Sequence, residues 1–387
     1  MRKIMVVAMV ALCMREVVGG TLNVPGDYET INDAAGAANA GDEIVIAKSD
    51  EMYSWTANLV IPQGVTVRGA TGDRNDVLIT FGGGTRFIDL CNDNTALADL
   101  TVTNATPPQR VIYLRNSKSV VRNCRIVNCS FSDYNSRGGI EMTTGLVTNC
   151  IVDSCVANLR RPHATGIVVS GGTLVDTVIR GCSIKGGWNQ GTYTDKNIRG
   201  AALRVTGGTV INCQVSDNTV GTFVDDNACP ERQLGLGIYA SGSATIVNTT
   251  VVGNTYAGDV SGHLYGLAAD SANVKVRNCV ILDNGNVGGA IANIAPAAVF
   301  DHCAVAAREV LGCTDCVAAT LADDLRCSAD GIYAPTRNSV LKDAGKDDYV
   351  PTGITEDLVG ANRIIGRHVD IGAVECQTRP GLVLVFR

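Results

Sequence analysis

The sequence is poor in charged and aromatic residues: of its 387 residues, 18% are Asp, Glu, Lys or Arg and 5% are Phe, Trp or Tyr. It has no arginine-rich run or basic stripe, and its formal net charge is -6, so we expect no nucleic-acid partner. Motifs for nucleotide loops, HExxH zinc sites and Ser-His-Asp catalysis are missing. After residue 20, no apolar stretch is long enough to span a bilayer. These absences argue against several common enzyme and membrane-protein classes.

A helical period is likewise missing from most of the chain, which instead repeats one six-residue phrase. The phrase reads apolar, any residue, Asn or Asp, small, any residue, apolar. Its clearest copies are residues 121–126, 147–152, 210–215 and 276–281, and looser copies begin at 97, 174, 246 and 300. Because the copies follow one another at about 24 to 36 residues, the sequence has the period of a solenoid.

The third position of each phrase predicts a sharp backbone corner, because Asn and Asp tolerate the left-handed conformation. A second apolar segment precedes the corner, for example at residues 139–142, 166–169, 202–205 and 237–240. We therefore predict an all-β fold, a right-handed parallel β-helix with three strands per coil and roughly nine or ten coils. Leucine-rich repeats would need a dense leucine consensus, and β-propellers would need tight antiparallel hairpins. Neither pattern is present.

The N-terminal region has two features of its own. Arg2 and Lys3 precede the apolar stretch 4–14, which is typical of a signal peptide. Apolar residues at 31, 34, 35 and 38 then have helical spacing, and Gly41 ends that pattern. We predict that this helix caps the open core of the first coil.

Four segments follow from these patterns: a signal peptide over 1–20, the capped β-helix over 21–305, an irregular C-terminal cap over 306–376 and a tail over 377–387. The signal peptide predicts a secreted protein, either extracellular or at the cell surface. We expect no membrane span and a monomeric chain.

Most of the 15 cysteines occupy repeat positions rather than the irregular spacing of a disulfide scaffold. One position is shared by Cys124, Cys150, Cys213, Cys279 and Cys303, and a second by Cys129, Cys155 and Cys182. We predict that these thiols are buried packing residues that do not pair. A CxxC pair at 313 and 316 lies outside the recognised repeats, and we expect a local disulfide or simple packing there rather than zinc or redox chemistry.

Two stretches carry a family resemblance. The run "VPGDYETINDAAGAANAGDEIVIA", followed by "LVIPQGVTVRGATG", resembles the opening of the pectin-lyase-like superfamily. The runs "NSVLKDAGKDD" and "DLVGANRIIGRHVDIGAVE" resemble the closing segment of secreted bacterial β-helix proteins, in which Asp370 and Glu375 would hold the cap. The resemblance covers residues 21–376. It implies the fold, whereas function must come from a site.

The loops between one coil and the next are long in four repeats, and stacked insertions on one side of a repeat protein commonly build its binding surface. Three of their aromatic residues are substrate-binding candidates: Trp188, Tyr193 and Phe223. Strand alternation turns Glu141, Arg204 and Tyr239 outward in one row on the first strand of each coil. We predict that an extended, acidic polysaccharide binds along this sheet, from Glu141 to Tyr239.

If the protein cleaves this ligand, β-elimination at a uronic acid is expected in preference to glycoside hydrolysis, because no counterpart of the polygalacturonase aspartates and His-Gly is found. Arg204 is the candidate base, with His163 as an alternative, and Tyr239 is the candidate acid. The resemblance to pectate lyases also implies calcium. Its candidate ligands are Glu141, Asp225 and Asp226.

A non-catalytic role is the alternative. In that case the chain would be a cell-surface or adhesin-like structural solenoid, whose loops bind another protein or nothing. A groove with clustered aromatic residues would favour the polysaccharide ligand, whereas a smooth charged flank would favour the structural rod.

Overall fold

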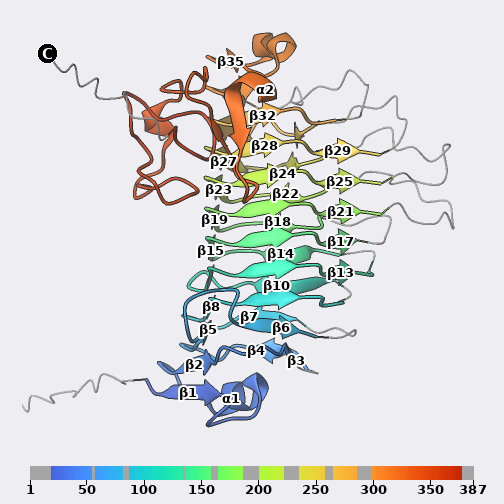
Figure 1. Ribbon diagram of the computed structural model, residues 1–387, viewed down its shortest axis with the longest axis vertical. Coiled ribbons are helices and arrows are strands. Elements are labelled where there is room, and N and C mark those ends of the chain that lie inside the picture. The colour runs from blue at the N-terminus through green and yellow to red at the C-terminus, as the bar shows by residue number, and fades with distance from the viewer. Residues whose placement is uncertain are drawn as a thin grey trace, which may run out of the picture.

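The computed structural model describes residues 19–54, 57–81, 87–107, 109–133, 136–157, 164–185, 200–221, 235–257, 265–285 and 299–376, except the side chains of 311–312. Its strands stack in a single elongated column (Figure 1). Four parallel sheets run along this column, two with eleven strands, one with eight and one with five. The chain is a right-handed parallel β-helix, as predicted.

We number the sheets in the order in which a coil visits them. The first sheet contains β4 (Leu59–Val60), β7 (Ile88–Leu90), β10 (Arg110–Leu114), β14 (Gly138–Met142), β18 (Ile167–Val169), β22 (Leu203–Val205), β26 (Ile238–Ala240) and β30 (Leu267–Ala269). The second contains β1 (Thr21–Val24), β2 (Glu43–Ile46), β5 (Thr66–Gly69), β8 (Ala96–Ala98), β11 (Val120–Arg122), β15 (Leu146–Thr148), β19 (Thr173–Val175), β23 (Thr209–Ile211), β27 (Thr245–Val247), β31 (Lys275–Arg277) and β33 (Val299–Asp301).

The third sheet follows the corner of the repeat phrase and has β3 (Tyr53–Ser54), β6 (Leu78–Thr80), β9 (Thr101–Thr103), β12 (Arg125–Val127), β16 (Ile151–Asp153), β20 (Val178–Arg180), β24 (Gln214–Ser216), β28 (Thr250–Val252), β32 (Val280–Leu282), β34 (Ala304–Val305) and β35 (Val317–Ala318). The fourth has β13 (Ser130–Phe131), β17 (Val156–Ala157), β21 (Ser183–Ile184), β25 (Thr219–Val220) and β29 (Thr255–Tyr256). Five central coils thus carry a short fourth strand that the sequence reading did not include.

Two left-handed corners explain this path. The predicted corner is confirmed, because the third residue of every phrase has a positive φ of 48 to 59°: Asp99, Asn123, Asn149, Asp176, Asn212, Asn248, Asn278 and His302. A second corner between the third and fourth sheets uses Asn128, Ser154, Gly181, Asp217 and Gly253, also with positive φ. Each left-handed residue turns the strand sharply without a longer loop.

Inward side chains form columns along the axis. The thiols of Cys124, Cys150, Cys213, Cys279 and Cys303 lie in one column, and all five are free and buried. A second column begins with Cys129, Cys155 and Cys182 and continues with Asn218, Asn254 and Asn284. The predicted packing role of the thiols agrees with this burial, whereas the asparagine continuation was not recognised from the sequence.

The expectation that the CxxC pair lies outside the repeat is wrong. β35 pairs with β34, so that Ala304 is opposite Val317. Asp315 has the left-handed φ of a corner residue, and Cys316 Sγ accepts a hydrogen bond from Cys303 N at 3.3 Å. The six-residue phrase thus returns once more, at residues 313–318. Cys313 and Cys316 occupy its first and fourth positions, which both point inward, and this explains the CxxC spacing.

The two ends of the column are covered differently. Helix α1 (Ile31–Ala37) lies at the N-terminal end, where Thr30 caps it and Ile31 and Ala34 are buried, as predicted. At the other end, 3-10 helix η2 (Ala307–Gly312) and helix α2 (Leu321–Asp324) flank β35. Among the described residues, neither helix has the length and apolar character needed to cross a membrane.

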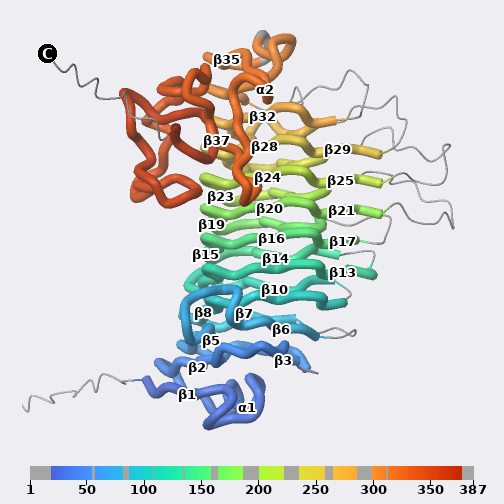
Figure 2. Tube along the Cα trace, in the orientation of Figure 1, coloured from blue at the N-terminus to red at the C-terminus, as the bar shows by residue number. Residues whose placement is uncertain are grey.

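The closing segment, residues 325–376, contains β36 (Leu325–Cys327), β37 (Tyr333–Pro335) and 3-10 helix η3 (Asp347–Tyr349). It does not simply sit on the last coil, as we had expected, but runs back along the flank of the column (Figure 2). Gln214 Nε2 donates to Gly331 O at 2.8 Å, and Asn212 Nδ2 donates to Glu356 O at 2.8 Å. Both bonds reach the same coil, and their partners are 117 and 144 residues apart in the sequence.

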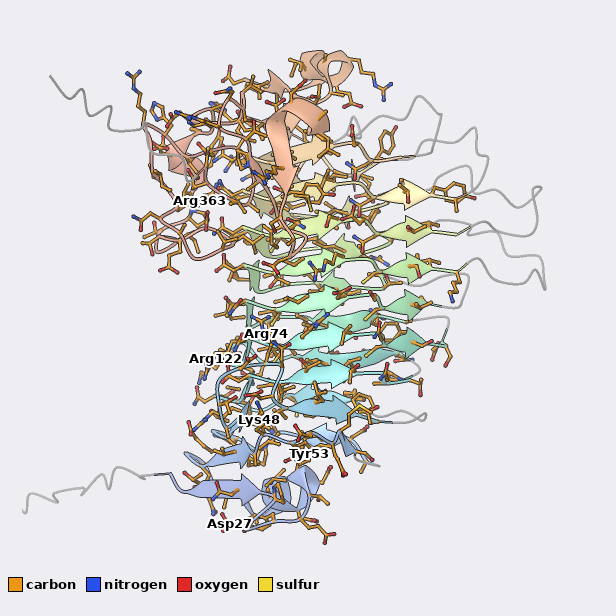
Figure 3. All side chains as sticks on the ribbon, in the orientation of Figure 1. Asp27, Lys48, Tyr53, Arg74, Arg122 and Arg363 are labelled. Carbon is orange, nitrogen blue, oxygen red and sulfur yellow. The ribbon has the colours of Figure 1, made fainter. Side chains whose placement is uncertain are left out.

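A buried ionic network holds the closing segment together, with Arg363 at its centre (Figure 3). Arg363 donates to three backbone carbonyls and pairs with Glu375 at 3.1 Å. Asp370 accepts from the backbone N–H groups of Asp343 and Cys376. Asp370 and Glu375 thus have the structural role that the resemblance implies.

Candidate functional site

The outward column of the first sheet brings the predicted row together. The strand registers place Glu141 beside Val168, Val168 beside Arg204, and Arg204 beside Tyr239. The same column extends in the N-terminal direction to Tyr113 and Asp89. Because neighbouring coils repeat at about 4.8 Å, Glu141 and Arg204 are about 10 Å apart along the axis.

The predicted groove is less open than we expected. Glu141 is 5% exposed, and Val168 and Tyr239 are each 2% exposed, whereas Arg204 is half-buried. The Arg204 guanidinium lies 5.9 Å from the centroid of the Tyr239 ring, a cation–π contact. The Tyr239 hydroxyl donates to Asp270, so this phenol already has an acceptor. Strand alternation predicts that these side chains line the outer face of the sheet, but three of the four are almost fully buried there.

Glu141 is held by two guanidinium groups. Arg110 Nε lies 2.8 Å from Glu141 Oε2, an ion pair whose atoms are not aligned as a hydrogen bond. Arg137 Nη1 donates to Glu141 Oε1 at 3.1 Å. A calcium ion at this carboxylate would have to displace both arginines, so the only candidate calcium ligand that the structure describes does not fit that role.

A cluster that the sequence reading missed lies at the N-terminal end of the same column. We call it the Tyr113 cluster: Tyr113, Phe87, Arg110 and Arg115. The Arg110 guanidinium is 4.5 Å from the Tyr113 ring centroid and 5.6 Å from that of Phe87, and the two rings meet edge to face at 6.2 Å. Arg115 approaches Tyr113 at 5.4 Å. The cluster combines aromatic surface with two guanidinium groups, of which Arg110 is paired with Glu141.

Arg115 is the most accessible cation of this cluster, with 45% of its side chain exposed. It donates two hydrogen bonds to the buried carboxylate of Asp89, at 3.0 and 2.7 Å. The hydrogen bonding to Asp89 raises the pKa of Arg115 above its ordinary value. Asp89 thereby fixes the guanidinium plane while part of it still faces solvent, as anion recognition requires.

A sequence signal for this cluster was present. Residues 110–115, "RVIYLR", form the same alternating strand as the later apolar segments, and Tyr113 occupies the position of Glu141. Val111 stands at the position where the other copies have glycine or alanine, so the pattern of those copies does not include this segment.

The other predicted site residues cannot be placed in this geometry. His163, Trp188, Tyr193, Phe223, Asp225 and Asp226 lie outside the described residues. Their roles in catalysis, sugar stacking and calcium binding stay predictions.

A separate cavity of about 810 Å³ lies between the last coils and the start of the closing segment. Its wall includes Asp324, whose carboxylate accepts from Thr320 N, Ser339 Oγ and Val340 N at 2.9 to 3.0 Å. These bonds fix the carboxylate to the surrounding backbone. The first sheet is therefore the better candidate site.

Comparisons with known proteins concern the fold. The family described as "Right handed beta helix region" matches residues 88–310. Among solved structures, a pectate lyase, Pel9A, shares 12% identity over 92% of this chain and 96% of that chain, with a TM-score of 0.48. The PL6 family alginate lyase AlyGC shares 14% identity over 82% of this chain and 55% of that chain, with a TM-score of 0.27. A PL6 alginate lyase in complex with a trisaccharide shares 11% identity over 84% and 93%, with a TM-score of 0.29. No curated protein sequence matches.

Proposed function

This chain belongs to the family of right-handed β-helix regions, whose first sheet here stacks eight strands, and we propose that it binds an extended, acidic polysaccharide along this sheet. The Tyr113 cluster is the observation that supports this proposal. Binding begins at the cluster and continues along the column toward Tyr239. The proposed site therefore extends one coil further toward the N-terminus than the stretch expected from sequence.

The chemistry of the cluster favours an anionic chain. Arg115 is oriented by Asp89 and partly exposed, so it can form a charge-assisted contact with a carboxylate. The rings of Tyr113 and Phe87 add apolar surface that suits a sugar ring. Successive coils then offer a new side chain about every 4.8 Å, which matches an extended ligand rather than a compact one.

Cleavage by β-elimination is the finer part of the proposal. In this reaction Arg204 would take the proton from the carbon beside the uronate carboxylate, and Tyr239 would protonate the leaving oxygen. The contact between these two side chains supports their joint action. His163 is the alternative base. Calcium would neutralise a uronate if Asp225 and Asp226 hold it, and no step depends on Glu141 as its ligand.

We also propose that the chain is exported and acts outside the cell, on the strength of its N-terminal sequence pattern. The alternative function is a non-catalytic surface rod. The low exposure of Glu141, Val168 and Tyr239 favours that alternative, because these three side chains offer little surface to a ligand.

The test is a binding assay of the purified chain with polygalacturonate, alginate and a neutral glucan. We expect binding to the two acidic polymers that weakens with salt, and no binding to the glucan. Arg115→Ala should weaken binding about tenfold, through the loss of one charge-assisted contact. Arg122→Ala is the matched control, because Arg122 is an exposed arginine on β11 of the second sheet.

Two outcomes would contradict the proposal. Equal weakening by Arg115→Ala and Arg122→Ala would mean that binding reflects general charge, and unchanged binding in Arg115→Ala, Trp188→Ala and Arg204→Ala would exclude the first sheet. Cleavage is tested separately through the ultraviolet absorbance of unsaturated products, with and without a chelator. Arg204→Ala should abolish that absorbance while the fold is retained.

A further inference from the structure

We propose that Asp301, His302 and Asp315 bind a divalent transition metal of the zinc class at the outer corner of the last two coils. Ligand atoms of the three side chains lie within 4.8 Å of one another. Two carboxylates and one imidazole form a ligand set that suits first-row metals and leaves a coordination position for water. The site is separate from the first sheet and does not depend on polysaccharide binding.

The backbone fixes these three residues on neighbouring coils. Asp301 forms a parallel bridge with Thr314. His302 N donates to Thr314 O at 2.9 Å, and Thr314 N donates to Phe300 O at 3.0 Å. His302 and Asp315 are both left-handed corner residues, with φ of 50° and 47°. The strand pairing therefore brings their side chains to the same edge before any metal arrives.

The residue types at this corner are not needed for the turn. The seven preceding corners of the repeat phrase carry Asn or Asp. Histidine occurs only at 302, which is the one corner with an aspartate directly before it and another at the corner of the next coil. Since asparagine would make the same backbone turn, the imidazole has a role other than the conformation of the corner.

The surroundings are compatible with a metal of moderate affinity. Asp301 Oδ1 and His302 Nδ1 lie 2.6 Å apart, so the carboxylate and the imidazole are already in contact. Ligand atoms around a tetrahedral zinc ion are about 3.3 Å apart for metal–ligand bonds of about 2.0 Å. The side chains of Asp301 and His302 must therefore rotate slightly apart to bind it.

Neighbouring groups limit the affinity but leave access. The Tyr349 hydroxyl donates to Asp301, while Arg277 and Lys346 lie 4.3 and 4.9 Å from the Tyr349 ring centroid. The two cations lower the attraction for a metal, so the affinity should be weaker than that of a structural zinc site. Asp315 is exposed, and the metal can enter beside it. Calcium does not suit an imidazole ligand.

The experiment uses the full chain after treatment with a chelator. Calorimetric titration with Zn²⁺ should give one site, and an excess of Ca²⁺ should leave Zn²⁺ binding unchanged, because Ca²⁺ does not compete for a site with an imidazole ligand. Co²⁺ should give visible absorption without the intense sulfur charge-transfer bands that cysteine ligands would produce. Saturating Zn²⁺ should also raise the unfolding midpoint by about 2 °C or more, because it binds only the folded corner.

The variants keep the corner intact. His302→Asn and Asp315→Asn place a residue used at other corners, so both should fold, and each should weaken Zn²⁺ binding at least tenfold. Asp99→Asn is the matched control: it removes one carboxylate from a corner near the other end of the column, and Zn²⁺ binding should not change. No Zn²⁺ binding by the unmodified chain, equal binding in all variants, or Co²⁺ spectra dominated by sulfur would each overturn the proposal.

Discussion

The asparagine column offers a quantitative test of what holds the upper coils together. Asn254 is fully buried between Asn218 and Asn284. Its Oδ1 accepts from Asn218 N and Nδ2 at 3.2 and 2.8 Å, and its Nδ2 donates to Val215 O at 2.9 Å and to Asn284 Oδ1 at 2.8 Å. The substitution Asn254→Cys is conservative in shape, because Cys182 occupies this column two coils earlier.

The expected cost follows from the bonds that are lost. Cysteine cannot accept from Asn218 as an amide oxygen does, so the Asn218 backbone N–H loses its partner in the described structure, at about 1 to 3 kcal/mol. The hydrogen bonds that Asn254 Nδ2 donates to Asn284 and Val215 are replaced by weak thiol contacts, which costs about 1 kcal/mol in total. We therefore expect Asn254→Cys to reduce the free energy of unfolding by about 3 kcal/mol.

Urea unfolding followed by far-ultraviolet circular dichroism would measure this loss. The matched control is Cys155→Ala, which removes a buried side-chain atom from the same column without breaking an amide chain, and it should cost about 1 kcal/mol. A larger loss in Cys155→Ala than in Asn254→Cys would refute the reasoning, because it would mean that filled volume matters more than hydrogen bonding in this column.

Three further predictions follow from the core and the closing segment. Ile167→Asp should unfold the chain by burying an unpaired charge in the fully enclosed core, which loss of the far-ultraviolet β signal would report; a folded variant would contradict the burial of this position. Mass spectrometry of unreduced peptides should find no Cys124–Cys150 link, since both thiols are free members of one column; a linked peptide would disprove it. Burial and the charge of Asp370 raise the pKa of Glu375 to about 8, against the opposing effect of Arg363. A raised pKa in the folded protein means that the free energy of unfolding is highest below pH 4.5 and falls as the pH rises toward 8. The loss is at most about 5 kcal/mol. Glu375→Gln should therefore raise the unfolding midpoint at pH 9 but not at pH 4, and an equal effect at both would exclude this titration.

The repeat made most of the fold predictable. A corner needs only one left-handed residue, so Asn123 or Asn149 identifies it locally, and strand alternation then decides which neighbours point inward. The second corner was harder to find because Ser154 and Gly181 stand there beside asparagine and aspartate. With no single residue type to mark it, the fourth sheet was missed.

The site was less predictable than the fold. Alternation correctly placed Glu141, Arg204 and Tyr239 in one column, but it carries no information about which groups lie against them. Glu141 is engaged by Arg110 and Arg137, which come from the preceding coil and from the residues just before β14. Such contacts depend on the lateral placement of long side chains, and the sequence pattern does not encode it.

The closing segment has a consequence for the order in which the chain is made. Arg180 Nη1 donates to Asp330 O, and Asn278 Nδ2 donates to Lys346 O, so synthesis must continue for 150 and 68 residues before these groups meet their partners. On a growing chain, these polar groups on the flank of the column therefore meet their partners only after the closing segment has been synthesised. Once the closing segment is bound to the flank, the coils that it contacts can no longer unfold one at a time, as the end coils of a free solenoid would. They must therefore separate together.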